Sequence, residues 1–568
     1  MRMINNLKGA KPNKIITDLR HLVKSSAEQF ENKPLYWYKE GDSYVPYPYS
    51  RLWEEMNAFG TALAAHDLMG KNIAVMGDTH PRWICAYLAT INGNGCIVPI
   101  DKELAMDSII DFLELAEVEA VVYTGVMNDK IAACADRLPR VKAFIPIHAE
   151  GETVEDEKIL PFAQMLEEGK AALDSGETCY TDCVLDMQKM SALLFTSGTT
   201  GTSKGVMLSH GNLTAATNAA CQSMSYDDNN NFVSVLPPHH SYEITCGHLA
   251  IMNLGATIRI NDSLKHVMRN FKEEAPNALM LVPLYVETMH KKIWDTVRKQ
   301  GMEKKLRMGM KLSGVLLAFG IDMRQKIFAQ VLDAFGGRLK SIVCGGAPLA
   351  PELVKDFYAF GITVLEGYGI TECAPLVAVN RPGDVHLHSV GLPVNGCQVR
   401  IDKQPEDETG EILVKGDNVM MGYYRNPEAT AAVFTEDGWF RTGDIGYMDD
   451  KGYIYITGRK KNVIILSNGK NVFPEELEEY LTPLPSIDEV VVLARENSNG
   501  ELTITALVYP NEEMFAGVSP DEVFAKIKAD INEVNKKLPS FKQIRGIEIR
   551  EERFERNTSR KIQRFKIK

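Results

Sequence analysis

Short apolar runs alternate with longer amphipathic stretches through most of the chain. Runs of four or five mostly apolar residues indicate buried strands at Ile73–Met76, Ala120–Tyr123, Ala192–Phe195, Phe232–Leu236, Ala256–Ile260, Ala278–Val282, Ser341–Cys344 and Ile362–Leu365. Stretches with helical periodicity lie between several of them, as in Leu213–Met224 and Arg324–Phe335. Strands that alternate with helices are typical of mostly parallel sheets covered by helices, so the pattern predicts an α/β fold.

The pattern changes after Gly410. Glu411–Val414 and Gly452–Thr457 have the character of short strands joined by turns, and they predict a small β subdomain. We expect a domain boundary after Gly458. It divides the chain into a large N-terminal domain, residues 1–458, and a small C-terminal domain, residues 459–568.

The C-terminal domain has an alternation of its own. Pro474 opens a helix at the first helical position, and Ser519 with Glu522 predicts a capping box for a helix that reaches about Lys537. Strands are expected at Val463–Leu466, Glu489–Ala494, Thr503–Val508 and Gly546–Arg550. This content predicts a small α+β domain.

Charge and composition narrow the class of protein. The 568 residues exceed what one hydrophobic core usually supports, and the formal net charge of −12 argues against a nucleic-acid partner. The segment Lys536–Lys568 is the exception, because it is basic and could meet an anionic ligand or lie solvated.

The ten cysteines show no spacing typical of zinc sites, which favours reduced thiols in a cytoplasmic protein. We expect no signal peptide and no transmembrane segment, whereas peripheral membrane contact and oligomeric state stay open.

The stretch Thr196–Val206 carries the clearest chemistry. It follows a predicted strand and reads Thr-Ser-Gly-Thr-Thr-Gly-Thr-Ser-Lys-Gly-Val. Glycines let backbone N–H groups turn inward, hydroxyls add donors, and Lys204 supplies a cation, which together favour a polyphosphate. The spacing differs from a Walker A loop, in which glycine directly precedes the lysine. A flexible polar turn is the alternative.

Other polar stretches stand where open α/β sheets place their ligands, namely Pro237–Glu243, Gly345–Pro348, Glu366–Glu372 and Trp439–Asp444. Glu372 is a candidate Mg²⁺ ligand, and Asp444 could accept hydrogen bonds from ribose hydroxyls. The paired histidines in the first stretch lack a third ligand at zinc-like spacing, which favours a lining role. Tight turns, surface acids and, in the basic loop Asn557–Lys561, a solvated lysine are the alternatives.

In this order the stretches resemble the AMP-forming acyl-CoA synthetases of the adenylate-forming ligase superfamily. The resemblance begins near Asp78, in Gly77–Trp83 and Pro99–Asp101, and runs to the C-terminus. It implies that ATP and a carboxylic acid form an acyl-adenylate with release of pyrophosphate, and that coenzyme A then takes the acyl group with release of AMP.

The resemblance also implies roles for individual residues. By this resemblance, the β- and γ-phosphates are bound by Thr196, Ser197, Gly198, Thr199, Thr200, Gly201 and Lys204. The adenine is surrounded by Gly345, Gly346, Ala347, Glu366, Gly367, Tyr368 and Gly369. Thr371 contacts the α-phosphate, Glu372 holds Mg²⁺, and Asp444 with Arg459 binds the ribose. His240 and Tyr242 line the acyl substrate site, with His240 also a catalytic candidate.

In the small, mobile domain, Lys561 matches the family's C-terminal catalytic lysine, which stabilises charge on the carboxylate and α-phosphate oxygens. Lys461 falls on the hinge position, and Gly469 with Lys470 lies on the thiol-access loop. Four departures from the family pattern are Ser203 for proline, Arg560 for glycine, Arg459–Asn462 in place of paired acids, and Ile465 for lysine. The last bears on thioester formation.

The acyl group is expected to be a long- or medium-chain fatty acid, because the stretch between Pro283 and Gly345 resembles the extended region of the long-chain branch. Helices are expected there at Tyr285–Lys299 and Lys304–Leu317. One alternative transfers the acyl group to an acyl carrier protein, an acidic partner that the basic C-terminal segment would suit. The other is a catalytically inactive relative that binds nucleotide or lipid.

Overall fold

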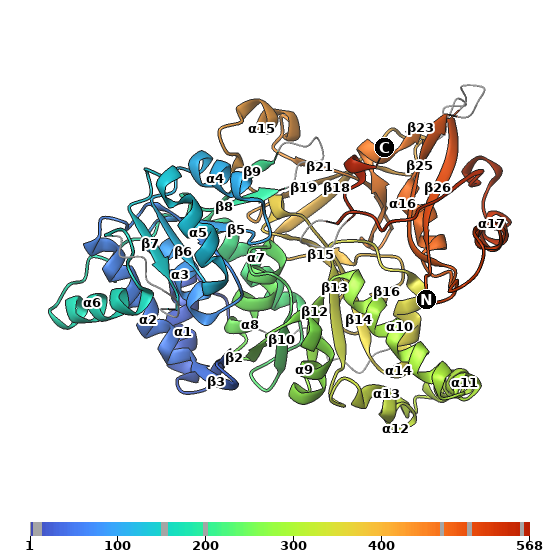
Figure 1. The fold of residues 1–568 in the computed structure, drawn as a ribbon, viewed down its shortest axis with the longest axis horizontal. Coiled ribbons are helices and arrows are strands. Elements are labelled where there is room, and N and C mark those ends of the chain that lie inside the picture. The colour runs from blue at the N-terminus through green and yellow to red at the C-terminus, as the bar shows by residue number, and fades with distance from the viewer. Residues whose placement is uncertain are drawn as a thin grey trace.

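The computed structural model describes residues 2–3, 14–148, 157–196, 203–465, 471–496, 502–556 and 562–567. Figure 1 shows a large lobe built of two sheets with helices around them, and a small lobe, coloured red, at its upper right. The predicted α/β class is confirmed. The elements of the large lobe alternate as the apolar pattern indicated, and its two principal sheets are mostly parallel.

The larger sheet has nine strands in the order β17-β15-β14-β13-β12-β10-β11-β2-β3. From β14 to β2 the neighbours run parallel, and both edges are antiparallel. Its strands are β2 (Pro34–Glu40), β3 (Ser43–Pro48), β10 (Asn231–Ser234), β11 (Thr257–Ile260), β12 (Ala278–Leu281), β13 (Ser341–Gly345), β14 (Thr363–Gly369), β15 (Leu376–Val379) and β17 (Leu392–Pro393).

The second sheet has seven strands in the order β20-β9-β8-β5-β4-β6-β7. They are β4 (Asn72–Met76), β5 (Cys96–Ile100), β6 (Ala120–Tyr123), β7 (Ala143–Pro146), β8 (Met190–Thr196), β9 (Lys204–Ser209) and β20 (Gly422–Tyr423). Ile73 and Val75 join one hydrophobic cluster, while Ala74 and Met76 join another on the opposite face. Burial on both faces explains why these strands are apolar throughout rather than alternating.

Helices cover these sheets. They are α1 (Leu19–Phe30), α2 (Tyr49–Ala65), α3 (Pro81–Asn92), α4 (Met106–Leu115), α5 (Asn128–Cys134), α6 (Phe162–Asp174), α7 (His210–Ser223), α8 (Ala250–Asn253), α9 (Val267–Glu274), α10 (Pro283–Lys299), α11 (Glu303–Ala318), α12 (Arg324–Ile327), α13 (Ala329–Asp333) and α14 (Pro351–Phe360). Nearly every residue of α3 is buried, as is most of α7, so both lie inside the lobe rather than on its surface.

The β subdomain is a four-stranded antiparallel sheet of β18 (Cys397–Asp402), β19 (Gly410–Gly416), β21 (Phe440–Met448) and β22 (Ile454–Arg459), with α15 (Pro427–Val433) beside it. The small pair β1 (Arg2–Met3) and β16 (Val385–His386) is also antiparallel. The boundary that we expect after Gly458 falls one residue before the end of β22.

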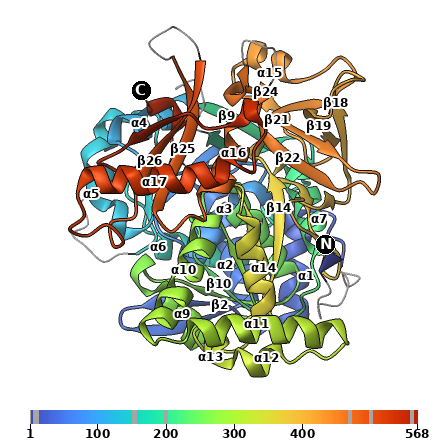
Figure 2. The same ribbon diagram turned by 90° about the vertical axis from the view of Figure 1, so that its right-hand side faces the viewer.

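The small lobe carries a three-stranded sheet of β25 (Ile487–Glu496), β26 (Leu502–Pro510) and β27 (Gly546–Ile549), the helices α16 (Pro474–Leu481) and α17 (Pro520–Asn535), and the pair β23 (Ile464–Ile465) and β24 (Asn471–Val472). The capping box is present, with Ser519 and Glu522 bonded to each other's backbone. In Figure 2, which faces this lobe, α17 lies across the front of its sheet. The buried residues of this lobe's main hydrophobic cluster all lie between Ile464 and Ile544, so the small lobe has a core of its own.

One expectation about local structure was wrong, and one strand is longer than expected. Arg324–Phe335 forms two short helices rather than one, because the chain leaves helical geometry at the buried Phe328 (φ −108°, ψ 24°). The strand expected at Ile362–Leu365 continues further, since β14 runs from Thr363 to Gly369 and pairs with β15.

Candidate active site

A cleft of 3630 Å³ lies between the two lobes. Its wall is formed on one side by the ends of β8, β13 and β14, and on the other by α16 and β25. Every predicted site residue that the structure describes lines it: Thr196, Lys204, His240, Tyr242, Gly345, Gly346, Ala347, Glu366, Gly367, Tyr368, Gly369, Thr371, Glu372, Asp444, Arg459 and Lys461. The others, Ser197, Gly198, Thr199, Thr200, Gly201, Gly469, Lys470 and Lys561, lie outside the described residues.

The lysine of the phosphate-loop stretch is held by a β-hairpin. Thr196 at the end of β8 pairs with Lys204 at the start of β9. The Lys204 Nζ lies 4.7 Å from the centroid of the Tyr423 ring, on the neighbouring strand β20. An ammonium group over an aromatic face is held weakly, so it can turn toward an anionic ligand.

Tyr423 also contacts the predicted metal-binding carboxylate. Its hydroxyl donates to Glu372 Oε1 at 2.9 Å, and the Glu372 carbonyl accepts from the Met420 amide at 2.8 Å. Burial and the adjacent carboxylate raise the pKa of the Tyr423 hydroxyl, so it stays protonated and serves as a donor. Because an ionised carboxylate accepts on both oxygens, Glu372 keeps acceptor capacity for a hard cation. Sequence analysis missed Tyr423.

A buried carboxylate joins the adenine-side strand to the subdomain. Asp444 on β21 accepts from the Tyr368 hydroxyl at 2.6 Å and forms an ion pair with Arg459 Nε at 2.9 Å. Only 3% of Asp444 is exposed, so these two partners balance a charge that water cannot reach. Each carboxylate oxygen has a second lone pair, which leaves room for ribose hydroxyls beside the present partners.

The residues expected on the adenine side come from two adjacent parallel strands and the turn after β13. Gly345 ends β13 and pairs with Gly367 on β14, and Gly346 follows with φ +94°, a conformation that favours glycine. Glu366 precedes this pair. Burial, with Glu479 of the small lobe adding a smaller effect, raises its pKa to about 8.

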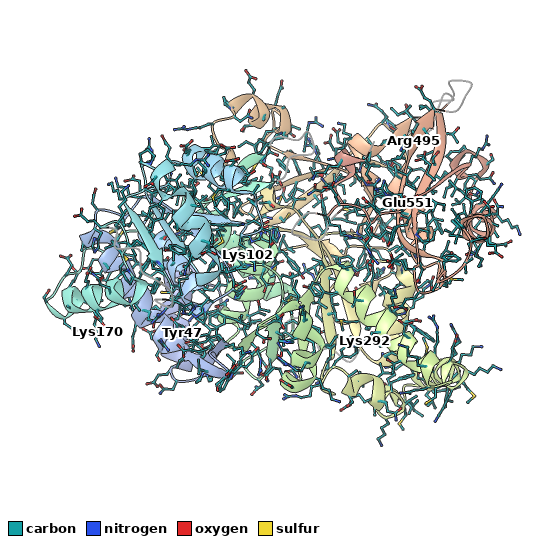
Figure 3. The ribbon with its side chains drawn as sticks, in the orientation of Figure 1. Tyr47, Lys102, Lys170, Lys292, Arg495 and Glu551 are labelled. Atoms are coloured by element: carbon teal, nitrogen blue, oxygen red, sulfur yellow. The ribbon has the colours of Figure 1, made fainter. Side chains whose placement is uncertain are left out.

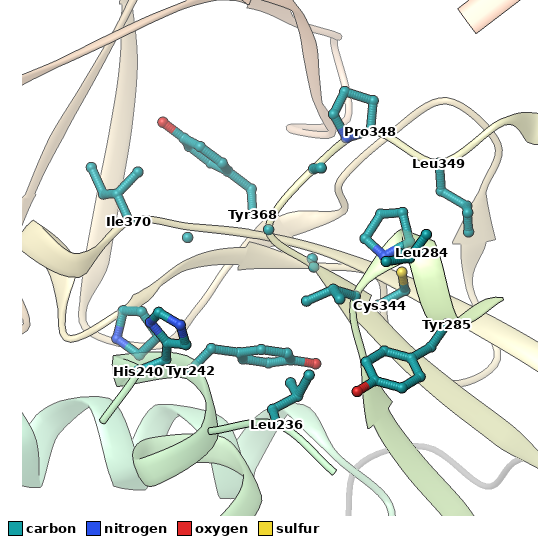
Figure 4. Close-up of a pocket in the computed structure, with 18 of the residues that line it drawn as sticks. Leu236, His240, Tyr242, Leu284, Tyr285, Cys344, Pro348, Leu349, Tyr368 and Ile370 are labelled. Carbon is teal, nitrogen blue, oxygen red and sulfur yellow. The ribbon is translucent and has the colours of Figure 1, made fainter. Parts of the chain in front are cut away.

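The acyl-side residues lie below this strand pair. In Figure 4, Tyr242 extends toward Tyr285, and His240 lies to its left, below Ile370. The Tyr242 hydroxyl donates to the Val343 carbonyl at 3.0 Å, which fixes the ring across the pocket floor.

The paired histidines hold no metal cluster. Among the described residues, no group of three or more histidine, cysteine or acidic side chains is arranged to bind a metal ion. His239 Nε2 lies 3.7 Å from Asp101 Oδ2, and burial lowers the pKa of its imidazole to about 4. The imidazole is therefore neutral near pH 7, which suits the lining role expected from the sequence.

A buried acid supports this floor. Glu243 begins the π-helical segment Glu243–Leu249, accepts from Ser234 Oγ at the end of β10, and lies 3.5 Å from His248 Nε2. Burial raises its pKa to about 8, so the carboxyl is mostly protonated at neutral pH. A side chain at Gly247 would collide with it, since a Cβ there would lie 2.7 Å from Glu243 Oε2. Glu243 is the last residue of the polar stretch Pro237–Glu243 singled out from the sequence, but no role was assigned to this acid there.

The small lobe presents titratable groups to the cleft. Lys461 lines it beside Arg459, and burial followed by that neighbouring charge lowers its pKa to about 8. Arg556 and Ile562 form an antiparallel bridge, and both line the cleft. The flanks of the segment that contains Lys561 therefore face the large lobe's site.

Comparison with known proteins agrees with this geometry. A model described as AMP-binding enzyme matches residues 23–424, and one described as AMP-binding enzyme C-terminal domain matches residues 461–567. The chain is 28% identical over 483 residues to fatty acyl-CoA synthetase A of Dictyostelium discoideum, covering 80% of this chain and 70% of that protein. It is 24% identical over 566 residues to a chloroplastic long-chain-fatty-acid–[acyl-carrier-protein] ligase of Arabidopsis thaliana, covering 88% and 77%.

The fold matches a solved structure over almost its entire length. An anthranilate CoA ligase in complex with anthranoyl-AMP superposes with a TM-score of 0.77 at 17% identity, over 98% of this chain and 97% of that one. The likeness supports the two-lobed fold, and the family models together account for both lobes. The chain belongs to the AMP-binding enzyme family.

Proposed function

We propose that the protein activates a long- or medium-chain fatty acid with ATP and transfers the acyl group to coenzyme A. The observation that carries this proposal is the convergence of residues from five separated stretches on one cleft between the lobes. Its 3630 Å³ exceeds an ordinary small-molecule pocket several-fold, as a site for a nucleotide, an acyl chain and a thiol requires.

In the first half-reaction, a carboxylate oxygen of the fatty acid attacks the α-phosphorus of ATP and pyrophosphate leaves. Lys204 binds the β- and γ-phosphates, and Thr371 contacts the α-phosphate. Asp444 and Arg459 orient the ribose while Gly345–Ala347 and Tyr368 enclose the adenine. These contacts hold the two reactants in line, which is the main contribution that a protein makes to such a transfer.

Mg²⁺ fits the side chains present. Glu372 would hold it, because one carboxylate beside phosphate oxygens is the donor set that Mg²⁺ prefers. When bound, the ion offsets the negative charge of the phosphates. Tyr423 steadies Glu372 through its hydrogen bond and leaves the other oxygen to the ion.

The acyl chain occupies the apolar side of the cleft. Leu236, Leu284 and Tyr285 surround the floor made by Tyr242, as Figure 4 shows. Each buried CH₂ contributes about 0.8 kcal/mol, so a wall of this kind favours long chains over short ones. Fatty acyl-CoA synthetase A, the relative from Dictyostelium, agrees with this substrate class.

In the second half-reaction, the thiol sulfur attacks the acyl carbonyl and AMP leaves. The small lobe turns about Lys461 between the two steps, which withdraws Lys561 and brings Gly469 and Lys470 to the incoming thiol. The main small-lobe core is separate from the large-lobe clusters, so such a turn breaks little apolar contact.

The test is an assay of the purified full-length chain with ATP, Mg²⁺, coenzyme A and a panel of fatty acids from C6 to C18. We expect pyrophosphate release and acyl-CoA formation that rise with chain length into the medium or long range. Pyrophosphate release with none of the acids would overturn the proposal.

A second candidate keeps the same adenylation and uses an acyl carrier protein as acceptor. The basic segment Lys536–Lys568 and the acyl-carrier-protein ligase from Arabidopsis favour it. Acyl transfer to a holo-carrier protein, without transfer to free coenzyme A, would decide for this candidate.

A further inference from the structure

Helix α11 carries an apolar stripe on its outer face. Met308 is 67% exposed, Leu312 53%, Val315 56% and Phe319, just past the helix end, 78%. Their spacing of four, three and four residues places them one above another on a single side of the helix. Ile321, 51% exposed, extends the stripe beyond the helix.

The opposite face of α11 accounts for its attachment to the large lobe. Leu306 and Met310 pack against the core, Ser313 is buried, and the Arg307 guanidinium lies 4.6 Å from the Trp294 ring centroid on α10. The helix is therefore apolar on two opposite sides, and only one of them is used by the fold. An apolar stripe of this length on the outside is not explained by packing.

Basic residues flank the stripe. Lys304, Lys305, Arg307 and Lys311 stand against the single acid Glu303 over residues 303–321, in a chain whose net charge is −12. Glu303 pairs with Arg307 at 3.0 Å, whereas the three lysines form no ion pair with any residue in the described ranges. Three exposed ammonium groups thus lie beside exposed apolar side chains.

The position of α11 suits a broad, flat partner. It projects at the lower right corner of Figure 1 and lies along the lower edge in Figure 2, and in Figure 3 its side chains fan outward into open space. The exposed apolar side chains and the exposed lysines beside them form the combination with which a helix binds the surface of an anionic bilayer. None of the described helices is long and apolar enough to cross a membrane, and α11 itself has 16 residues.

We propose that α11 is an interfacial membrane-docking helix that binds bilayers containing anionic lipids. Met308, Leu312, Val315 and Phe319 enter the boundary between headgroups and acyl chains, and Lys304, Lys305 and Lys311 meet the lipid phosphates. Docking here places α10, which lines the acyl side of the cleft through Leu284 and Tyr285, directly behind the membrane-bound helix.

The experiment is flotation of the full-length protein with vesicles of phosphatidylcholine, alone or with about 30 mol% phosphatidylglycerol. We expect binding to the anionic vesicles that weakens in high salt, and little binding to pure phosphatidylcholine. The double variant L312S/F319S should lower the bound-to-free ratio at least about tenfold, and K304Q/K305Q/K311Q should abolish the preference for anionic lipid. Val184→Ser is the matched control, because Val184 is 87% exposed in a different part of the lobe.

Folding is checked by circular dichroism melting and by light scattering, neither of which depends on the proposed enzymatic activity. Wild-type protein that stays unbound, or variants that float as wild type does, would overturn the docking helix. A stripe that serves a second copy of the chain would show itself as a dimer lost in L312S/F319S without vesicle binding. Binding of an acidic holo-carrier protein, lost in the lysine variant without vesicle binding, would equally count against a lipid partner.

Discussion

The two walls of the cleft are built in different ways. On the large-lobe side, the predicted site residues stand on strands of extended sheets or in the short segments that follow them, and Asp444 is held by two buried partners. On the small-lobe side, the lining is rich in titratable groups such as Lys461, Glu479 and Arg556. The main apolar core of each lobe is separate. The difference suggests a division of roles, in which the proposed nucleotide site stays fixed on the large lobe while the small lobe changes which groups it presents to the cleft.

The strongest test of this contrast is Lys561→Ala. If the small lobe supplies the charge that stabilises the transition state, adenylate formation should fall about 100- to 1000-fold while ATP affinity stays within a few-fold. Pyrophosphate release measures the first quantity and titration calorimetry with ATP the second. Lys566→Ala removes an exposed lysine five residues later and should behave as wild type. Equal activity in Lys561→Ala would remove this residue from the mechanism.

Asp444→Asn tests the fixed wall. Removing a charge that bonds to Tyr368 and Arg459 should raise the KM for ATP about 10- to 100-fold, or about 1.5–3 kcal/mol, with a smaller change in kcat. Steady-state kinetics with ATP as the varied substrate measure this. The control is Asp437→Asn, an exposed acid of the same subdomain paired with Arg400. A fall in kcat at unchanged KM would mean that Asp444 acts in the chemical step rather than in ATP binding, which contradicts the role proposed for the large lobe.

Glu243→Gln tests the support beneath the large-lobe wall. The folded-state pKa, near 8, lies above the ordinary value of 4.5, so this group's stabilisation is complete at low pH and is lost as pH rises through 8. Between pH 5 and 8 the wild type should lose about 3 kcal/mol of unfolding free energy that the glutamine variant keeps. Melting temperatures across this range give the slope, and exposed Glu54 replaced by glutamine is the control. Parallel slopes in wild type and Glu243→Gln would contradict the assignment.

The smallest effect is expected where the lobes touch. Lys291 Nζ on α10 lies 3.7 Å from Asp488 Oδ1 of the small lobe, and the lysine is half exposed. Lys291→Ala should change the free energy of unfolding by no more than about 0.5 kcal/mol, as should Lys292→Ala, its exposed neighbour labelled in Figure 3. Urea titrations compare the two variants. A loss above about 1 kcal/mol in Lys291→Ala alone would mean that the lobes are held together more firmly than their separate cores suggest.

The apolar pattern was sufficient for most strands and for the order of the motifs, since burial on both faces leaves runs such as Ile73–Met76 almost without polar residues. It failed where distant packing decides. Phe328, Leu332 and Phe335 have the spacing of one helix, yet Phe328 packs against Phe360, with ring centroids 5.3 Å apart, and the helix breaks there. Local periodicity carries no information about such a contact.

Candidate site residues could be proposed from the sequence where their chemistry is unusual, as in the Gly/Ser/Thr-rich stretch that contains Lys204. Tyr423 was missed, and the buried supporting role of Glu243 was not predicted, for opposite reasons. A tyrosine on a short strand has no special local pattern, and its value comes from two partners far away in the chain. An isolated acid such as Glu243 is ordinarily exposed, so only the fold shows that it is buried.

Tyr423 affects how the charges of Lys204 and Glu372 are arranged beside the proposed phosphate site. Its ring holds the Lys204 ammonium and its hydroxyl holds Glu372, so one aromatic side chain acts as a spacer between a cation and an anion that would otherwise neutralise each other. Both contacts are individually weak and easily exchanged. If ATP and Mg²⁺ bind as proposed, they meet two opposite charges that are already kept apart, instead of having to break a salt bridge first.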